Sequence, residues 1–399
     1  MKKVLIISQM YPSFAEKNRG IFVHKQVKEI VKQGCQVKVV SPVPLAQFPI
    51  KNLSKKWKDY SKIPLEEEID KIKIYHPRYI DFPKALFFSF SGERMYRGVK
   101  NTVSDLYRGF RFDIVHAHTA LPSGYAGMEI AKQYKKPLIV TIHGADFQKT
   151  IFKNKRCRDA VIKTINYSRK TIAVSNKLKR IGQNELDIEE NKIEVIPNGI
   201  DTEEIFEGQS KLSEKYKGKK IILSVSNLVK TKGIDLNLKA IKKIEKKYPN
   251  LIYLIIGRGK ERKNLKSLVR KLELERKVIF LGELSHKETM EYISICDIFS
   301  LPSWQEGFGI VYLEAMVQGR PIIACKGEGV KDFIKNKKNG ILVEPKNVSD
   351  LSAAIDFLFS NLEKSKKIAT EAKNTVFGKY TLDKIARQII SLYNNQNKK

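Results

Sequence analysis

Two glutamates frame a glycine-rich turn in the second half of the chain. Glu306 opens the run Glu-Gly-Phe-Gly-Ile-Val-Tyr-Leu-Glu, which closes at Glu314. Gly307 and Gly309 flank Phe308 and let the backbone approach a ligand, and the helical pattern that follows directs free N–H groups towards an anion such as a diphosphate. Carboxylates also accept hydrogen bonds from sugar hydroxyls. A solvated surface turn is the alternative that the spacing alone leaves open.

Histidines stand near the carboxyl ends of two apolar runs in the first half. Asp-Ile-Val-His-Ala-His ends at His118, and Thr-Ile-His-Gly contains His143. Ligands of open parallel sheets bind at the carboxyl ends of the strands. The His-x-His spacing alone suggests a metal, but no Cys or acidic residue nearby completes a ligand set, and the chain has no Asp-x-Asp motif. We therefore expect no metal and no other cofactor.

Short apolar runs alternate with helical patterns along the chain, in two series. Continuous Val/Ile/Leu runs are typical of strands buried on both faces, and intervening helices indicate parallel sheets covered by helices. The strand candidates are 3–8, 37–41, 113–117, 138–143, 171–175 and 193–197, then 221–225, 251–257, 278–281, 298–301 and 321–325. The sequence predicts an α/β protein of two doubly wound, Rossmann-like domains that face each other across a ligand-binding cleft.

The turn-rich run Pro-Asn-Gly-Ile-Asp at 197–201 separates the two series. We predict an N-terminal domain over residues 1–198 and a second domain over 199–380. A last helical pattern, about 382–393, lies in a C-terminal segment 381–399, which could pack back on the first domain.

The composition is strongly basic, with enough apolar residues for ordinary cores. Hydrophobic residues make up 42% of the 399 residues, and Lys plus Arg exceed Asp plus Glu by 75 − 43 = 32. This charge favours nucleic acid, anionic lipid or a sugar nucleotide, although a Lys-rich composition that only maintains solubility is equally consistent. No apolar run is long enough to span a membrane, no signal-peptide cleavage site follows the first apolar run, and the four Cys form no C-x-x-C pair. We expect a cytoplasmic protein.

The Glu-x7-Glu spacing with its internal Gly-Phe-Gly resembles the signature of the retaining glycosyltransferases of family 4, which have the two-domain GT-B fold. Four further segments agree with this family: 195–201 (VIPNGID), 226–233 (SNLVKTKG), 254–259 (LIIGRG) and 339–345 (NGILVEP). The segment 116–143 also looks like enzymes of teichuronic-acid or capsule synthesis. The resemblance covers nearly the whole chain and is strongest over 195–345.

The resemblance implies a role for each matching residue. The second domain would bind the nucleotide-sugar, with Glu306 on hydroxyls of the transferred sugar and Glu314 on the ribose. The implied donor contacts are Gly20, Asn227, Lys232, Gly257, Arg258, Glu306, Gly307, Phe308, Gly309 and Glu314. The implied catalytic residues are His118, Lys232 and Glu306.

The first domain would carry the acceptor side of the site. By the resemblance, Gly20 lies near the donor phosphate and His118 approaches the transferred sugar. His143 or Asp146 would orient the acceptor hydroxyl. A purely structural pair is equally consistent with the sequence.

One position departs from the family pattern. Family members usually carry an Arg and a Lys, five residues apart, that neutralise the diphosphate. Lys232 matches the Lys, whereas Asn227 occupies the Arg position and keeps a donor without its charge. A charge-assisted hydrogen bond contributes roughly 1.5–3 kcal/mol against about 1 for a neutral one. We therefore expect Lys230 or Arg258 to supply the missing charge.

The resemblance implies a hexosyltransferase-type enzyme of cell-surface polysaccharide synthesis. It would transfer a sugar from a nucleotide-sugar, expected to be UDP-linked, to a lipid-linked or polymeric glycan acceptor with retention. Breaking the glycosidic bond leaves negative charge on the diphosphate. Lys232 and the helix start at Gly309 would stabilise that charge.

Two segments predict contact with an anionic membrane. Residues 149–180 hold eleven Lys or Arg against one acidic residue, and residues 82–96 interleave Phe and Leu with Lys and Arg. Such interleaving is typical of segments that lie on an anionic leaflet. We expect peripheral attachment to the inner face of the cell membrane. A loop that covers the core of the first domain is equally consistent.

Two other functions fit parts of the sequence. A GT-B sugar-nucleotide epimerase would isomerise its donor without an acceptor, and the charge of +32 also fits a polyanion- or nucleic-acid-binding protein. No recognisable nucleic-acid module is present, so no nucleic-acid partner is expected. The absence of G-x-G-x-x-G after residues 3–8 argues against a dinucleotide dehydrogenase.

Overall fold

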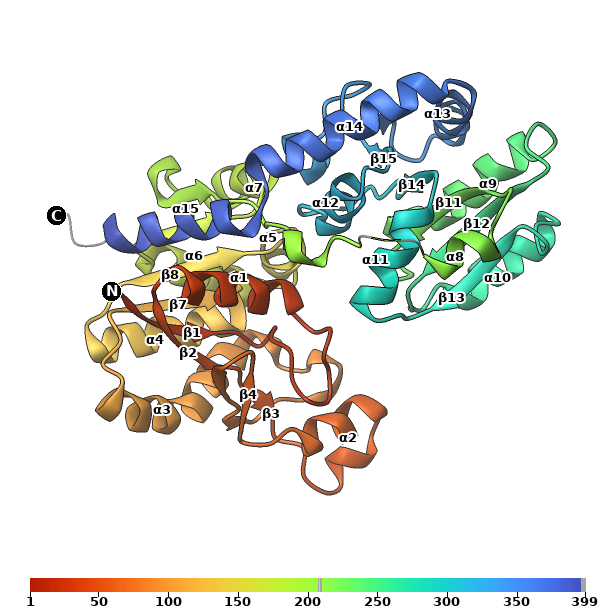
Figure 1. The fold of residues 1–399 in the computed structure, drawn as a ribbon. Helices are drawn as coiled ribbons and strands as arrows, with labels where there is room; N and C mark the ends of the chain where they lie inside the picture. The colour runs from red at the N-terminus through yellow and green to blue at the C-terminus, as the bar shows by residue number, and fades with distance from the viewer. Residues whose placement is uncertain (207, 209, 396–399) are drawn as a thin grey trace. The chain divides into compact units, whose positions relative to one another are not determined.

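The chain forms two compact units in the computed structural model, which describes residues 1–206, 208 and 210–395. The first unit contains Met1–Asn198 with the segment that begins at Leu382, and the second contains Gly199–Thr381. Each unit has a largely parallel sheet with covering helices (Figure 1). This confirms the predicted α/β class with two doubly wound, Rossmann-like domains. Residues 396–399 of the predicted segment 381–399 and positions 207 and 209 of the predicted second domain lie outside the described residues.

An eight-stranded sheet forms the centre of the first unit. In spatial order its strands are β10 (Ile193–Val195), β9 (Lys170–Ala173), β8 (Leu138–Ile142), β7 (Ile114–His118), β1 (Lys3–Ile7), β2 (Gln36–Val40), β5 (Ile72–Tyr75) and β4 (Glu66–Ile69). The pair β4–β5 at the edge is antiparallel, and the other neighbours are parallel. Every residue of β7 and β8 is buried, as expected for central strands with helices on both faces.

Within the described residues, the first unit has eight α-helices. They are α1 (Ile21–Lys32), α2 (Lys55–Lys62), α3 (Ser91–Gly109), α4 (Tyr125–Tyr134), α5 (Ala145–Gln148), α6 (Lys155–Tyr167), α7 (Asn176–Leu186) and α15 (Leu382–Asn394). Helix α15 packs against α1, where Ile385, Ile389 and Tyr393 share one buried cluster with Val23 and Val27. The C-terminal helix therefore completes the core of the first unit.

The second unit contains a six-stranded, fully parallel sheet. In spatial order its strands are β13 (Val278–Gly282), β12 (Leu251–Ile256), β11 (Lys220–Val225), β14 (Ile298–Ser300), β15 (Ile322–Cys325) and β16 (Ile341–Val343). Its helices are α8 (Lys211–Lys215), α9 (Ile234–Ile244), α10 (Arg262–Lys271), α11 (His286–Ile295), α12 (Ile310–Val317), α13 (Val348–Ser360) and α14 (Leu362–Lys379). Among the described residues of both units, no helix combines the length and apolar character needed to cross a bilayer.

Some strands escaped the sequence analysis because they are polar or very short. Strand β4 reads Glu-Glu-Glu-Ile and pairs only with β5, so its composition follows an exposed edge rather than a buried run. Strand β16 has three residues, and the separate pair β3 (Val43–Pro44) and β6 (Arg78–Tyr79) has two residues each. Two residues are too few for an apolar-run pattern to detect, whereas β16 was missed although β10 and β14, which also have three residues, were predicted.

Candidate active site

Glycine is required at the position just before helix α12 of the second unit, because a Cβ atom there would lie too close to neighbouring side chains. Gly309 precedes the helix with a φ of 92°, and a Cβ atom there would lie 2.6 Å from the Tyr312 ring and 3.2 Å from Cγ of Glu306. Phe308 is buried and its ring packs against Phe333. The Phe308 side chain therefore belongs to the core, which leaves its backbone to bind a ligand.

Lys232 and Glu306 form a close ion pair although 74 residues separate them. Lys232 donates from Nζ to Oε2 of Glu306 at 2.6 Å. The two side chains are only 20% and 14% exposed, so the pair is poorly screened by water. The structure thus brings together two of the three predicted catalytic residues and places an ammonium group beside a carboxylate.

The loop that carries Glu306 is fixed by the loop that follows β15. The Glu306 N–H donates to Oε2 of Glu328 at 2.6 Å, and the Gly329 N–H donates to the carbonyl oxygen of Glu306 at 3.3 Å. A Cβ atom on Gly329 would lie 2.1 Å from the carbonyl oxygen of Gly307. Sequence analysis missed Glu328. Its signal is the Gly-Glu-Gly turn directly after a buried strand.

Glu314 lies beside a histidine that the sequence analysis also missed. Nδ1 of His286 is 3.8 Å from Oε1 of Glu314, and Nε2 of His286 is 2.8 Å from Oε2 of Glu204. His286 is the first residue of α11, behind a capping box formed by Ser285 and Glu288. Its position at a helix start after a strand is the signal that could have identified it. The imidazole lies between two carboxylates, one of them the predicted ribose ligand.

The predicted phosphate turn after β12 packs tightly against the loop after β11. Gly257 has a φ of 131°, and a Cβ atom there would lie 1.9 Å from the carbonyl oxygen of Ser226. The Leu228 N–H donates to the carbonyl oxygen of Arg258 at 2.8 Å, which joins the two loops. Oγ of Ser226 is buried and has no hydrogen-bond partner. This hydroxyl is a further candidate ligand contact.

The polar side chains of these two loops lie at the surface. Asn227 and Lys230 are exposed. The Arg258 guanidinium lies 3.1 Å from a carboxylate oxygen of Glu283, and its side chain is 69% exposed. Arg258 therefore already has an anionic partner, whereas the Lys232 side chain is only 20% exposed and pairs with Glu306.

In the first unit, two histidines meet at the carboxyl ends of β7 and β8. Nδ1 of His118 lies 2.9 Å from Nε2 of His143, and the two rings are nearly parallel, with an interplanar angle of 10°. His118 is fully buried. The other nitrogen of each ring, Nε2 of His118 and Nδ1 of His143, is buried without a hydrogen-bond partner. These two atoms are available for a ligand.

Burial keeps both imidazoles neutral. It lowers the pKa of His118 well below its usual range, helped by His116 and His143, and lowers the pKa of His143 to about 3. In a hydrogen bond between neutral imidazoles, one ring donates and the other accepts. Of the two outer nitrogens, one is then a donor and the other an acceptor. The pair can therefore donate a hydrogen bond to a ligand hydroxyl or accept one from it.

Asp146 lies in α5, close to the loop that follows β7. Its Oδ1 accepts hydrogen bonds from the N–H groups of Ala120 at 3.0 Å and Leu121 at 3.4 Å, while Oδ2 is buried without a partner. Burial raises the pKa of this carboxyl to about 6. An unpaired buried polar atom costs about 1–3 kcal/mol, so a ligand that paired with it would recover that free energy.

Gly20 lies at the start of α1 with a φ of 61°. A Cβ atom at this position would lie 2.3 Å from the carbonyl oxygen of Met10, so the loop after β1 requires glycine here. Two residues later, the Phe22 ring contacts the His143 ring at 5.0 Å in an edge-on arrangement. The start of α1 therefore packs against His143 of the histidine pair.

His116 explains the His-x-His spacing without a metal. Its Nδ1 hydrogen-bonds to the Tyr393 hydroxyl at 2.6 Å and its Nε2 to Oγ1 of Thr141 at 2.7 Å. Both ring nitrogens therefore have protein partners. Across the part of the chain that the structure describes, no group of three His, Cys, Asp or Glu side chains is placed to hold a metal ion.

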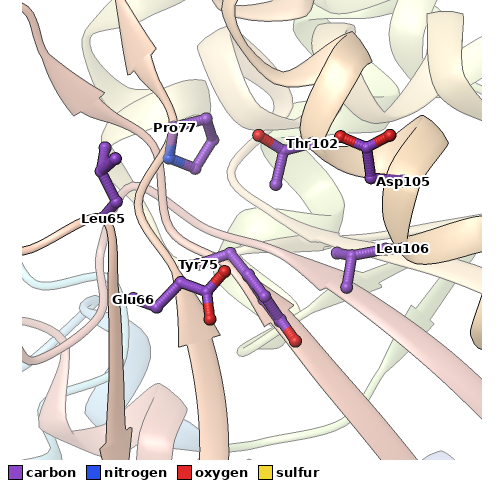
Figure 2. Close-up of a pocket in the computed structure, with 7 residues that line it drawn as sticks. All are labelled: Leu65, Glu66, Tyr75, Pro77, Thr102, Asp105 and Leu106. Atoms are coloured by element: carbon purple, nitrogen blue, oxygen red, sulfur yellow. The ribbon is translucent and has the colours of Figure 1, made fainter.

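A separate pocket of about 340 Å³ opens between the edge hairpin and α3. Figure 2 shows the seven residues that line it, Leu65, Glu66, Tyr75, Pro77, Thr102, Asp105 and Leu106. Two of these are carboxylates and none is a cation or a predicted site residue. Such a lining repels a diphosphate, so this pocket is not the candidate active site.

Two family profiles match the chain, one in each half. The family described as "Glycosyltransferase Family 4" matches residues 20–204, and that described as "Glycosyl transferases group 1" matches residues 206–375. A Bacillus subtilis (strain 168) glycosyltransferase assigned to teichuronic acid biosynthesis is 26% identical and covers 99% of both chains. An uncharacterised glycosyltransferase of Methanocaldococcus jannaschii is 31% identical over 65% of this chain and 69% of its own.

A solved structure shares the fold over the full length. Anabaena HepE in complex with UDP-glucose matches with a TM-score of 0.76 and 19% identity, over 99% of this chain and 100% of its own. Together the two profiles match residues 20–204 and 206–375, and the 31% identical relative is a glycosyltransferase covered over 69% of its length. The chain therefore belongs to the glycosyltransferases of family 4 and is an enzyme with the GT-B fold.

Proposed function

We propose that the protein transfers a sugar, with retention of configuration, from a UDP-sugar to a polymeric or lipid-linked glycan acceptor in cell-surface polysaccharide synthesis. The Lys232–Glu306 pair carries this proposal. It holds a cation suited to a diphosphate 2.6 Å from a carboxylate suited to sugar hydroxyls. The relative assigned to teichuronic acid biosynthesis supports the acceptor class, and the UDP-glucose complex of the structural neighbour supports the nucleotide.

The proposed reaction follows the charge that develops as the donor breaks. The bond between sugar C1 and the diphosphate oxygen breaks, and its electron pair leaves with the diphosphate. The acceptor oxygen bonds to C1 on the same face, and its proton passes to the leaving diphosphate. Lys232 and the helix start at Gly309 stabilise the leaving group. The neutral His118 hydrogen-bonds a sugar hydroxyl, with His143 and Asp146 on the acceptor side.

The proposed mechanism uses no metal, because Lys232 and backbone amides take the role that a cation bridging an Asp-x-Asp motif would have. EDTA should then change the transfer rate by less than about twofold. A large loss that Mg²⁺ or Mn²⁺ restores would contradict this part of the proposal. We also propose that the enzyme acts at the cytoplasmic face of the membrane and does not use nucleic acid as a partner.

Thermal unfolding with UDP, GDP and ADP tests the donor site directly. A nucleotide at 100 times its Kd should stabilise the protein by about 2.7 kcal/mol. We expect a UDP-selective shift that Glu314→Ala abolishes. Glu363→Ala, which removes an 87% exposed carboxylate of the same unit, is the matched control and should keep the shift. Equal shifts with all three nucleotides, or a shift that survives Glu314→Ala, would contradict the proposed donor site.

Product analysis distinguishes transfer from epimerisation. We expect a new glycan, with the anomeric configuration of the donor, only when an acceptor is present. Formation of a different UDP-sugar without an acceptor would instead establish the epimerase. NMR of the purified product reads both outcomes.

A further inference from the structure

A hydrophobic loop of the first unit lies open to solvent. Residues 80–90 join β6 to α3, and the short helical turns Pro83–Ala85 and Phe88–Phe90 within them contain no buried residue. The exposed apolar side chains are Ile80 (58%), Phe82 (37%), Leu86 (56%), Phe87 (64%) and Phe90 (39%). An exposed cluster of this kind contributes little to the core and typically marks an interaction site.

Arg94 makes three hydrogen bonds to this loop. Arg94 donates from Nε to the carbonyl oxygen of Ile80 at 2.9 Å, and from one terminal nitrogen to the carbonyl oxygen of Phe87 at 3.0 Å. Its other terminal nitrogen donates to Asp81 at 3.1 Å. The guanidinium therefore holds the loop backbone at Ile80 and Phe87 before any partner arrives.

The loop backbone adopts a costly conformation. Lys84, Ala85 and Phe87 have φ angles of 57°, 57° and 52°, in the left-handed region that residues other than glycine seldom occupy. This conformation turns Leu86 and Phe87 to the solvent rather than into the core. Backbone strain without a gain in burial is typical of functional segments.

Two exposed cations, one just before α6 and one in its first turn, pack on aromatic rings of this loop. Nζ of Lys153 lies 3.8 Å from the centre of the Phe88 ring, and the guanidinium carbon of Arg156 lies 3.5 Å from that of Phe90. Phe152, which is 59% exposed, precedes them in sequence. The loop and residues 152–156 thus form one aromatic–basic surface, made of Ile80, Phe82, Lys84, Leu86, Phe87, Phe90, Phe152, Lys153 and Arg156.

We propose that the aromatic–basic surface docks the enzyme on an anionic phospholipid bilayer. Leu86 and Phe87 enter the interfacial layer, and Lys84, Lys153 and Arg156 meet the lipid phosphates. Apolar tips surrounded by cations match the interface of an anionic leaflet. A single-stranded nucleic acid fits less well, because it needs open aromatic faces for base stacking, and cations already cover those of Phe88 and Phe90. This proposal does not depend on the identity of the donor sugar.

Sedimentation of the full-length protein with vesicles tests the docking. We compare phosphatidylcholine vesicles with vesicles that also contain about 30% phosphatidylglycerol, since each basic residue near an anionic surface adds to binding. The wild type should bind the anionic vesicles selectively. The double substitutions Leu86→Ser/Phe87→Ser and Lys153→Glu/Arg156→Glu should each weaken binding by about tenfold or more. Leu362→Ser, a 59% exposed apolar residue of the second unit, is the matched control and should leave binding unchanged.

A tryptophan probe reports insertion without removing the apolar contact. Phe87→Trp should show emission, above that of the wild type, that brominated phospholipid quenches in anionic vesicles. Unaltered binding of Leu86→Ser/Phe87→Ser, equal binding to neutral vesicles, or no quenching of bound Phe87→Trp would overturn the docking proposal. The UDP-dependent unfolding shift should persist in every variant. This readout separates loss of docking from misfolding and from failure of the donor site.

Discussion

The candidate site residues of the two units differ in how they carry charge. In the first unit, His118 and His143 are kept neutral by burial, and each has one ring nitrogen without a partner. In the second unit, Lys232 and Glu306 form a close ion pair that keeps some exposure. Neutral donors and acceptors suit sugar hydroxyls, whereas a cation beside a helix start suits a diphosphate. We infer that one unit recognises uncharged groups and the other recognises an anion.

Removal of Lys232, whose side chain is largely shielded from solvent, should have the largest effect. Lys232→Ala should lower kcat/KM by about 10²–10³, because it removes a preorganised charge from the leaving group. Lys246→Ala removes an exposed cation of the same unit that has no predicted role in the site, and is the matched control. Steady-state kinetics with the donor varied give the result. Equal losses in the two variants would mean that the ion pair with Glu306 has no special role.

Asp146→Asn should change how stability depends on pH in the first unit. Burial raises the pKa of Asp146 from 3.8 to about 6, so between these values the folded state binds more protons than the unfolded state. Stability therefore falls as the pH rises through this window. The full difference is about 3 kcal/mol, at 1.36 kcal/mol for each unit of pKa.

Urea unfolding at pH 4, 5, 6 and 7 measures this effect. The wild type should lose stability relative to Asp146→Asn as the pH rises, because the Asn amide does not titrate in this range. The Asn oxygen can still accept from the N–H groups of Ala120 and Leu121. A constant difference between the two proteins across this range would show that Asp146 is ionised in the folded state with an ordinary pKa.

The histidine pair should affect transfer without affecting nucleotide binding. His118→Ala should lower kcat/KM by about 10–10², the value of one or two hydrogen bonds to a buried site. His143→Ala should cost less, because it leaves the outer nitrogen of His118 in place. The UDP-induced unfolding shift should remain in both variants. A lost shift would mean that the two units do not divide recognition as proposed.

Arg258→Ala should have the smallest effect. The side chain is 69% exposed and already paired with Glu283, so we expect a change of less than about threefold in donor KM. A larger loss would identify Arg258 as the cation that replaces the charge missing at Asn227. Donor saturation curves for the wild type and the variant decide between these outcomes.

The buried sheets could be predicted from sequence, while contacts between loops could not. Continuous apolar runs predicted the central strands to within about one or two residues, as at β8, predicted over 138–143 and observed over Leu138–Ile142. The Glu-x7-Glu spacing and the Lys at 232 were identified by resemblance. Three contacts join loops that follow different strands: the Lys232–Glu306 ion pair, the hydrogen bond from Glu306 to Glu328, and the approach of His286 to Glu314. No local pattern specifies which of those loops meet.

The return of α15 to the first unit has a consequence for how the protein is made. Residues 1–198 are synthesised long before Ile389 and Tyr393. These two residues belong to the same buried cluster as Val23 and Val27. Residues 1–198 therefore leave part of their apolar surface exposed until α15 has been synthesised. Residues 199–381, in contrast, contain all the strands of their own sheet. Domains usually mature from the N-terminus during synthesis. Here we expect the middle of the chain to mature first, and the nascent N-terminal half to be the part that needs a chaperone.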